Sequence, residues 1–120
     1  MRLFLLPTIV ASLFATEQPL EPSEQAMRAA FELRLTEDVQ NALAYVAETA
    51  GPEGVERVRA AGTDRFAIEA FKKQDCVRNE TGHLCDFAIE VSVVNGKIQQ
   101  TLKGRFQSRP EGGLTFAYAS

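Results

Sequence analysis

The sequence contains no tryptophan and only one histidine, His83. That histidine and the two cysteines, Cys76 and Cys85, are too few ligands for the usual zinc sites. Acidic residues outnumber basic ones, 16 to 13, and the formal net charge of −3 argues against a protein that binds nucleic acid through its phosphates. The chain also lacks a glycine-rich phosphate-binding loop, so no cofactor is expected.

Long apolar runs are absent except at the N-terminus. There, Leu3–Phe14 follows the basic Arg2, precedes the small Ala15 and is too short to span a bilayer as a helix. A buried N-terminal helix is the alternative, but Pro7 lies in the middle of the run. We therefore expect residues 1–15 to be a signal peptide, the mature chain to be periplasmic or secreted, and no stable membrane insertion to remain after cleavage.

The two cysteines flank a candidate turn, Asn79–Gly82. A two-residue loop there would place Cys76 directly opposite Cys85, whereas a three-residue loop would shift the register by one. In an oxidising compartment the pair should form a structural disulfide. A redox-active pair is the alternative, although such cysteines usually lie closer together at a helix N-terminus.

Helical periodicity fills the first half of the chain after a polar, proline-containing leader, residues 16–23, which we expect to be flexible. From Glu24 onward, apolar residues recur at three- and four-residue spacing, and Thr36 either caps a new helix or lies inside a continuing one. Gly51 and Pro52 predict a helix end, and a shorter helix should follow over Glu53–Ala61.

The second half changes to the period-two alternation of β-strands. We expect four strands, at Phe66–Val77, Leu84–Val94, Lys97–Gln107 and Gly113–Ala119. The predicted fold class is α+β, with the N-terminal helices packed on one face of a four-stranded antiparallel meander sheet. Residues 24–120 should form this single domain.

The dipeptide Asn95-Gly96 predicts a type I′ hairpin turn between the second and third strands. Val94 would then oppose Lys97, and the next pairs would be Val93–Ile98, Ile89–Leu102, Phe87–Gly104, Asp86–Arg105 and Cys85–Phe106. This register predicts a buried sheet face, comprising Phe87, Ile89, Val91, Val93, Ile98, Leu102 and Phe106.

The other face of the sheet is the candidate interaction surface, because it mixes apolar with charged side chains. Its expected members are Phe71, Lys73, Ala88, Glu90, Val94, Lys103, Arg105 and Ala117. A protein partner or a second copy could dock there, and scattered surface residues without a role are the alternative.

No catalytic residue is predicted. His83 lies beside the turn, where we expect it to be exposed, and no nucleophile is placed near it. The acidic residues of the helical half have the pattern of solvated helix faces.

Over residues 24–119, the order of elements resembles the cystatin-like and nuclear-transport-factor-like α+β folds. Cystatin-type protease inhibitors insert a QVVAG-like hairpin into a protease, and Ser92–Gly96 (SVVNG) is similar in its Val-Val-x-Gly positions. Enzymes of the second fold use pocket Asp, His and Tyr residues, a resemblance that would involve Asp86, His83 and Tyr118. The chain also resembles small exported proteins of proteobacteria.

Three functions remain open at this point. The first is a non-enzymatic exported binding or interaction protein of unknown ligand. The second is an inhibitor of an extracellular hydrolase of the protease or lysozyme type. The third is a small-molecule binder or enzyme with a pocket between the helices and the sheet.

Overall fold

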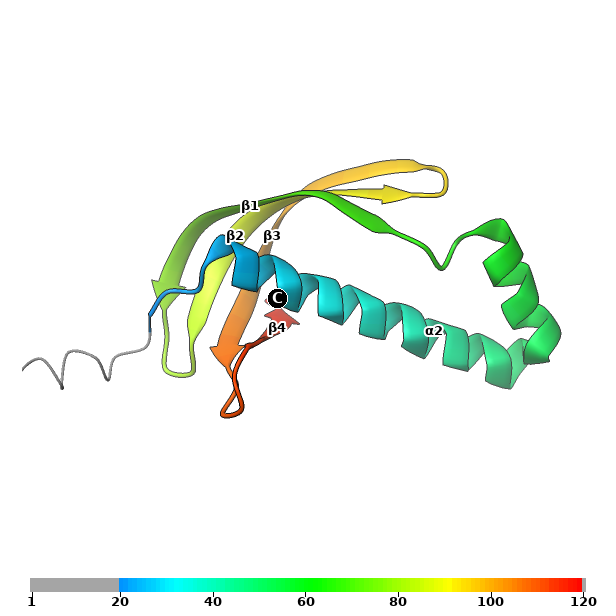
Figure 1. Ribbon diagram of the computed structural model, residues 1–120, viewed down its shortest axis with the longest axis horizontal. Helices are drawn as coiled ribbons and strands as arrows, with labels where there is room; N and C mark the ends of the chain where they lie inside the picture. Colours follow the sequence, from blue (N-terminus) through cyan, green and yellow to red (C-terminus); the bar gives the residue numbers. More distant parts are fainter. Residues whose placement is uncertain (1–19, 120) are drawn as a thin grey trace, which may run out of the picture.

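The computed structural model describes residues 20–119 as one helix, bent near its end, and one antiparallel sheet. Helix α2 (Glu24–Ala61) precedes β1 (Ala67–Arg78), β2 (His83–Val93), β3 (Gly96–Ser108) and β4 (Leu114–Tyr118). The strands pair in the order β1-β2-β3-β4, and α2 crosses one face of the sheet (Figure 1). The predicted α+β class, with helix packed on one face of a meander, is confirmed.

Helix α2 begins and bends where local chemistry requires it. The Ser23 hydroxyl accepts a hydrogen bond from the Ala26 N–H at 3.1 Å, which caps the helix. Thr36 lies inside the continuing helix and donates its hydroxyl hydrogen to the Glu32 carbonyl. Gly51 adopts a φ of 71°, outside the helical region, and Pro52 restarts the helix after it. The predicted break is confirmed, and Figure 1 shows the last turns folding back toward the sheet.

Phe31 of α2 is the centre of the core. Its ring lies 5.3 Å from the rings of both Phe87 and Phe116 and 6.0 Å from that of Phe71. Such tilted and edge-on aromatic pairs add to the stability from buried area. Met27 and Ala30 continue the same helix face into the sheet. The N-terminal third of α2 therefore supplies the helix side of the hydrophobic core.

The disulfide joins β1 to β2. Cys76 pairs with Cys85 across the strands, and their sulfur atoms are bonded. The connecting turn has the two-residue form, because Asn79 N–H donates to the Gly82 carbonyl at 2.8 Å. The Asn79 side chain also accepts from the N–H groups of Thr81 and Gly82. The disulfide prediction is confirmed in this structure.

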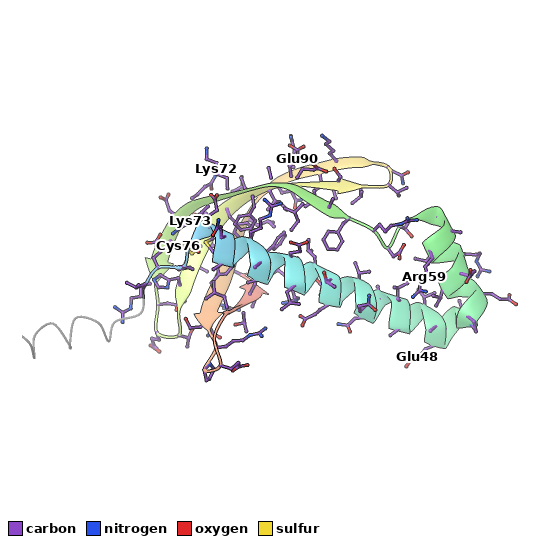
Figure 2. All side chains as sticks on the ribbon, viewed as in Figure 1. Glu48, Arg59, Lys72, Lys73, Cys76 and Glu90 are labelled. Carbon is purple, nitrogen blue, oxygen red and sulfur yellow. A yellow bond between two sulfur atoms is a disulfide. The ribbon has the colours of Figure 1, made fainter. Side chains whose placement is uncertain are left out.

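Strand β1 corrects the expected outward placement of Phe71 and Lys73. Its pairing with β2 shifts register between Ile68 and Ala70, and again between Lys73 and Cys76. One extra residue reverses the alternation that follows it. Phe71 therefore faces α2, is 7% exposed and stacks on Phe87. Lys73, which pairs with Phe87, also lies on the helix side (Figure 2).

Lys73 fastens the segment before α2 to β1. Its ammonium donates to the Pro22 carbonyl at 2.7 Å and forms an ion pair with Glu21 at 2.6 Å. Its backbone N–H donates to the Glu24 carboxylate. Residues 20–23 of the expected flexible leader are thus bound to the sheet, and Pro22 is buried. The remainder of that leader and the expected signal peptide lie outside the described residues.

The expected register between β2 and β3 is wrong by two residues. Val93 pairs with Gly96, Phe87 with Leu102 and Cys85 with Gly104, so Val94 and Asn95 form the turn. Among residues 20–119 only glycines have positive φ, so Asn95 does not adopt the conformation that a type I′ turn requires. A shift of two keeps every side chain on its predicted face. It replaces the expected Asp86–Arg105 pair by an Asp86–Lys103 ion pair at 3.3 Å.

Candidate ligand-binding cleft

Helix α2 and the sheet separate beyond the aromatic core. The helix crosses to the β4 side, where Arg34 stacks over the Tyr118 ring, and then runs on past the sheet. The β2–β3 hairpin extends in a different direction, so the two elements diverge (Figure 1). Between them lies an open cleft of about 400 Å³, a size within the usual range of ligand sites.

Most of the cleft wall is apolar. The helix contributes Phe31, Leu35, Val39 and Ala42, at the three- and four-residue spacing of one helix face. The helix-facing side of the hairpin contributes alternate residues, which are Ile89, Val91, Val93, Ile98 and Leu102. Phe66 closes the end at which the chain returns to β1.

The cleft leaves apolar surface in contact with water. Ile98 is 44% exposed and Val93 is 36% exposed, although both lie on the face that packs against α2 elsewhere in the sheet. A folded domain normally covers such a face, and exposed apolar surface around a hollow is a common feature of binding sites. The expected burial of Val93 and Ile98 is therefore wrong, because α2 does not reach this part of the hairpin.

Polar groups also line the cleft. Arg65, Asp64, Gln100 and Asp38 line it, and Tyr118 closes one end. Burial, together with the nearby Asp38 carboxylate, raises the pKa of the Tyr118 hydroxyl above its ordinary range, so this hydroxyl is neutral at physiological pH. One oxygen of Asp64, Oδ1, is buried and has no hydrogen-bond partner within residues 20–119.

The residues expected to form an interaction face are dispersed by the structure. Phe71 and Lys73 lie on the helix side, and Val94 lies in the hairpin turn with 53% exposure. Five members remain together on the outward face: Ala88, Glu90, Lys103, Arg105 and Ala117. Figure 2 shows Glu90 and Lys72 on this side, away from α2.

Two carboxylates on the outward face, Asp86 and Glu90, form ion pairs within the molecule. Lys97 forms an ion pair with Glu90 at 3.2 Å, and Gln99 donates to the same carboxylate. These contacts, the Gln99 hydrogen bond first, lower the pKa of Glu90. With Phe71 facing inward, the largest apolar side chain expected there is missing. The outward face is thus a weaker docking surface than the cleft.

His83 is buried, which corrects its expected exposure. It begins β2 on the helix-facing side, two residues from Cys85, and is 7% exposed. Within residues 20–119, no group of three or more His, Cys, Asp and Glu side chains could hold a metal ion. The described part of the chain also contains no helix long and apolar enough to cross a membrane.

A pocket between the helices and the sheet is one of the three functions that the sequence leaves open, but the sequence does not locate it, although the two walls of the cleft are each visible as patterns. The apolar stripe on the helix and the alternation in the hairpin were both assigned to one continuous core. Comparison of the chain with protein-family models, with curated proteins and with solved structures finds no match. The geometry of the cleft is therefore the principal guide to function.

Proposed function

We propose that this chain is a small exported binding protein that takes an apolar ligand into the cleft between α2 and the β2–β3 hairpin. The observation that carries the proposal is a cavity of about 400 Å³ whose wall is mostly aliphatic and aromatic. Burying apolar ligand surface contributes about 25 cal/mol per Å² before the costs of association. Binding of this kind needs shape and apolar area and requires no reactive side chain.

Export is the second part of the proposal. It rests on the expected signal peptide over residues 1–15 and is supported by the Cys76–Cys85 disulfide, which persists in oxidising compartments. N-terminal sequencing of the protein made from its full sequence should give a mature start near Thr16. Recovery of an intact N-terminus with two free thiols in the cytoplasm would contradict export.

Nile red, an apolar dye that fluoresces when removed from water, tests the cleft directly. Titration of the protein should give saturable fluorescence. The variant Ile98→Asp, which places a charge at the exposed cleft wall, should weaken this binding at least tenfold. Because Ile98 is already 44% exposed, the substitution should leave the core intact.

Thr101→Asp is the matched control, since Thr101 lies on the same strand with its side chain on the opposite face. It should bind the dye as the unchanged protein does. No saturable binding, or equal loss in the two variants, would contradict the proposed site. Near-ultraviolet circular dichroism of each variant establishes that the packed core persists.

A further inference from the structure

We propose that the natural ligand of the cleft is an extended segment of another polypeptide, which adds to β3 as a fifth strand. This inference rests on the proposed function and names the ligand class of the same site. Its basis is the edge of the sheet beside the cleft. An extended peptide can bind such an edge through its main chain while its alternate side chains enter neighbouring pockets.

Strand β3 is much longer than the strand that covers it. Pairing between β3 and β4 runs from Ser108–Leu114 to Gly104–Tyr118 and ends with the hydrogen bond from Ala119 N–H to the Lys103 carbonyl. From Gly96 to Leu102, no strand of residues 20–119 lies on this side of β3. The cleft therefore has no strand wall beyond Tyr118.

The hydrogen bond to Lys103 fixes which main-chain groups are free. A residue of an antiparallel strand directs its N–H and C=O to one side, and the next residue directs them to the other. Since Lys103 faces β4 and no register shift interrupts β3, the main-chain groups of Lys97, Gln99 and Thr101 face the open edge. The side chains of the intervening Ile98, Gln100 and Leu102 line the cleft.

The β1 edge of the sheet is protected in two ways that the free part of β3 lacks. Strand β1 is interrupted by two register shifts. Side chains of α2 also bond its main chain, because Arg28 donates to the Ile68 carbonyl and Glu24 accepts from the Lys73 N–H. Proteins normally protect exposed edges with such devices. The free part of β3 has no bulge and no proline, and within residues 20–119 no side chain bonds its outward main-chain groups, which favours a role in pairing.

A second copy of the chain fits this edge less well. Antiparallel pairing of two free β3 segments about Gln99 would set each Gln100 opposite Ile98 of the other copy, so a second polar amide would be added to the one that Gln100 already contributes to the cleft. A strand from a different polypeptide can place apolar side chains at all three positions opposite Ile98, Gln100 and Leu102. The partner chemistry is thus an extended segment with apolar residues at every second position.

The probe is a capped nonapeptide in which isoleucine alternates with serine and glutamate. Its control has the same composition with the isoleucines in one block. Isothermal titration against the protein, made from its full sequence, should show binding at least tenfold tighter for the alternating peptide. In a bound strand that runs antiparallel to β3, as the other strands of the sheet pair, serine and glutamate N–H groups would face β3. N-methylation of two of these should weaken binding at least tenfold, whereas N-methylation of two isoleucines should not.

Thr101→Pro supplies the matching test on the protein, because it deletes one outward N–H and leaves the bonds between β2 and β3. It should lose peptide binding, and Thr101→Ala should retain it. If the proline variant does not fold, the N-methylated peptides still decide the question.

Four results would overturn strand addition. These are no binding of the alternating peptide, equal binding of the blocked peptide, equal effects of the two N-methylations, and a dimer in sedimentation that Thr101→Pro abolishes. Nile red titration distinguishes failure of strand addition from failure of the proposed cleft function. Dye binding that Ile98→Asp removes would keep the cleft as a ligand site even when the peptide does not bind.

Discussion

Gly104 is the residue at which the packing of β4 on the core can be tested most sharply. A Cβ atom added there would lie 2.0 Å from Cε1 of Phe116 and 2.8 Å from its Cδ1. The Phe116 ring has little room to move away, because it is 7% exposed and its centroid lies 4.8–5.8 Å from the rings of Phe31, Phe87, Phe106 and Tyr118. Gly104→Ala must therefore displace β4 or the aromatic cluster.

The expected cost follows from two opposing effects. Overpacking a well-filled core costs about 1–3 kcal/mol, and the short contact places this case near the upper end. Replacing glycine by alanine reduces the freedom of the unfolded chain and offsets about 0.4–1 kcal/mol of that cost. The net loss should be about 2 kcal/mol, which lowers the melting temperature of a domain of this size by roughly 8–15 °C.

Thermal and urea unfolding of four proteins measure the effect: the unchanged chain, Gly104→Ala, Phe116→Leu and the double variant. Because leucine vacates part of the ring volume, the double variant should be more stable than the sum of the two single losses predicts. Arg105→Ala, on the exposed side of the next residue, is the control and should change stability by at most about 0.5 kcal/mol. Additive losses, or no loss in Gly104→Ala, would refute the reasoning.

Three further predictions concern the core, the disulfide and the charge that binds the N-terminal segment. Ile89→Ala should lower the free energy of unfolding, measured in urea, by about 2–5 kcal/mol, because Ile89 is buried. Ser92→Ala should lower it by at most about 1 kcal/mol, because the Ser92 hydroxyl donates only to the exposed Glu69. Equal losses would show that the sheet faces are misassigned. Replacing both Cys76 and Cys85 by alanine should lower the free energy of unfolding by about 2.5–3 kcal/mol and keep the fold, because the unfolded chain is no longer constrained by the closed loop. Unchanged stability would contradict a structural disulfide. The hydrogen bond and charge of Lys73 lower the pKa of Glu21, so this contact stabilises the fold at neutral pH and is lost as the pH falls below the ordinary range of a glutamate carboxyl and through this lowered pKa. In Lys73→Met the Glu21 pKa, followed by NMR titration, should return to its ordinary range, and an unchanged titration would exclude the ion pair.

Local chemistry explains which elements could be predicted from the sequence. Gly51 and Pro52 end a helix in almost any context, and the turn after Asn79 suffices to bring Cys76 and Cys85 together. The alternation of β2 likewise identifies its buried face. Each of these features depends on a few neighbouring residues, so tertiary structure has little opportunity to override it.

The errors arose where two arrangements satisfy the same pattern. A register moved by two residues leaves Phe87, Ile89 and Leu102 on the same face, so hydrophobic alternation cannot distinguish it. The expected outward placement of Phe71 is wrong because the two register shifts in β1 reverse the residues between them, and hydrophobic alternation does not show where such shifts occur. The position of the cleft could not be predicted for a third reason. It depends on the angle at which α2 leaves the sheet, which periodicity does not encode.

Unequal strand length connects the packing of β4 with the proposed binding edge. Strand β3 runs from Gly96 to Ser108, whereas β4 covers Leu114–Tyr118 only. Where β4 ends along β3 is set by Phe116, whose ring fits over the bare backbone of Gly104 and fixes the register of the pair. Tyr118 consequently stands at the boundary between the covered and the open parts of β3, at one end of the cleft. The same contact that completes the core therefore determines where the unpaired edge begins.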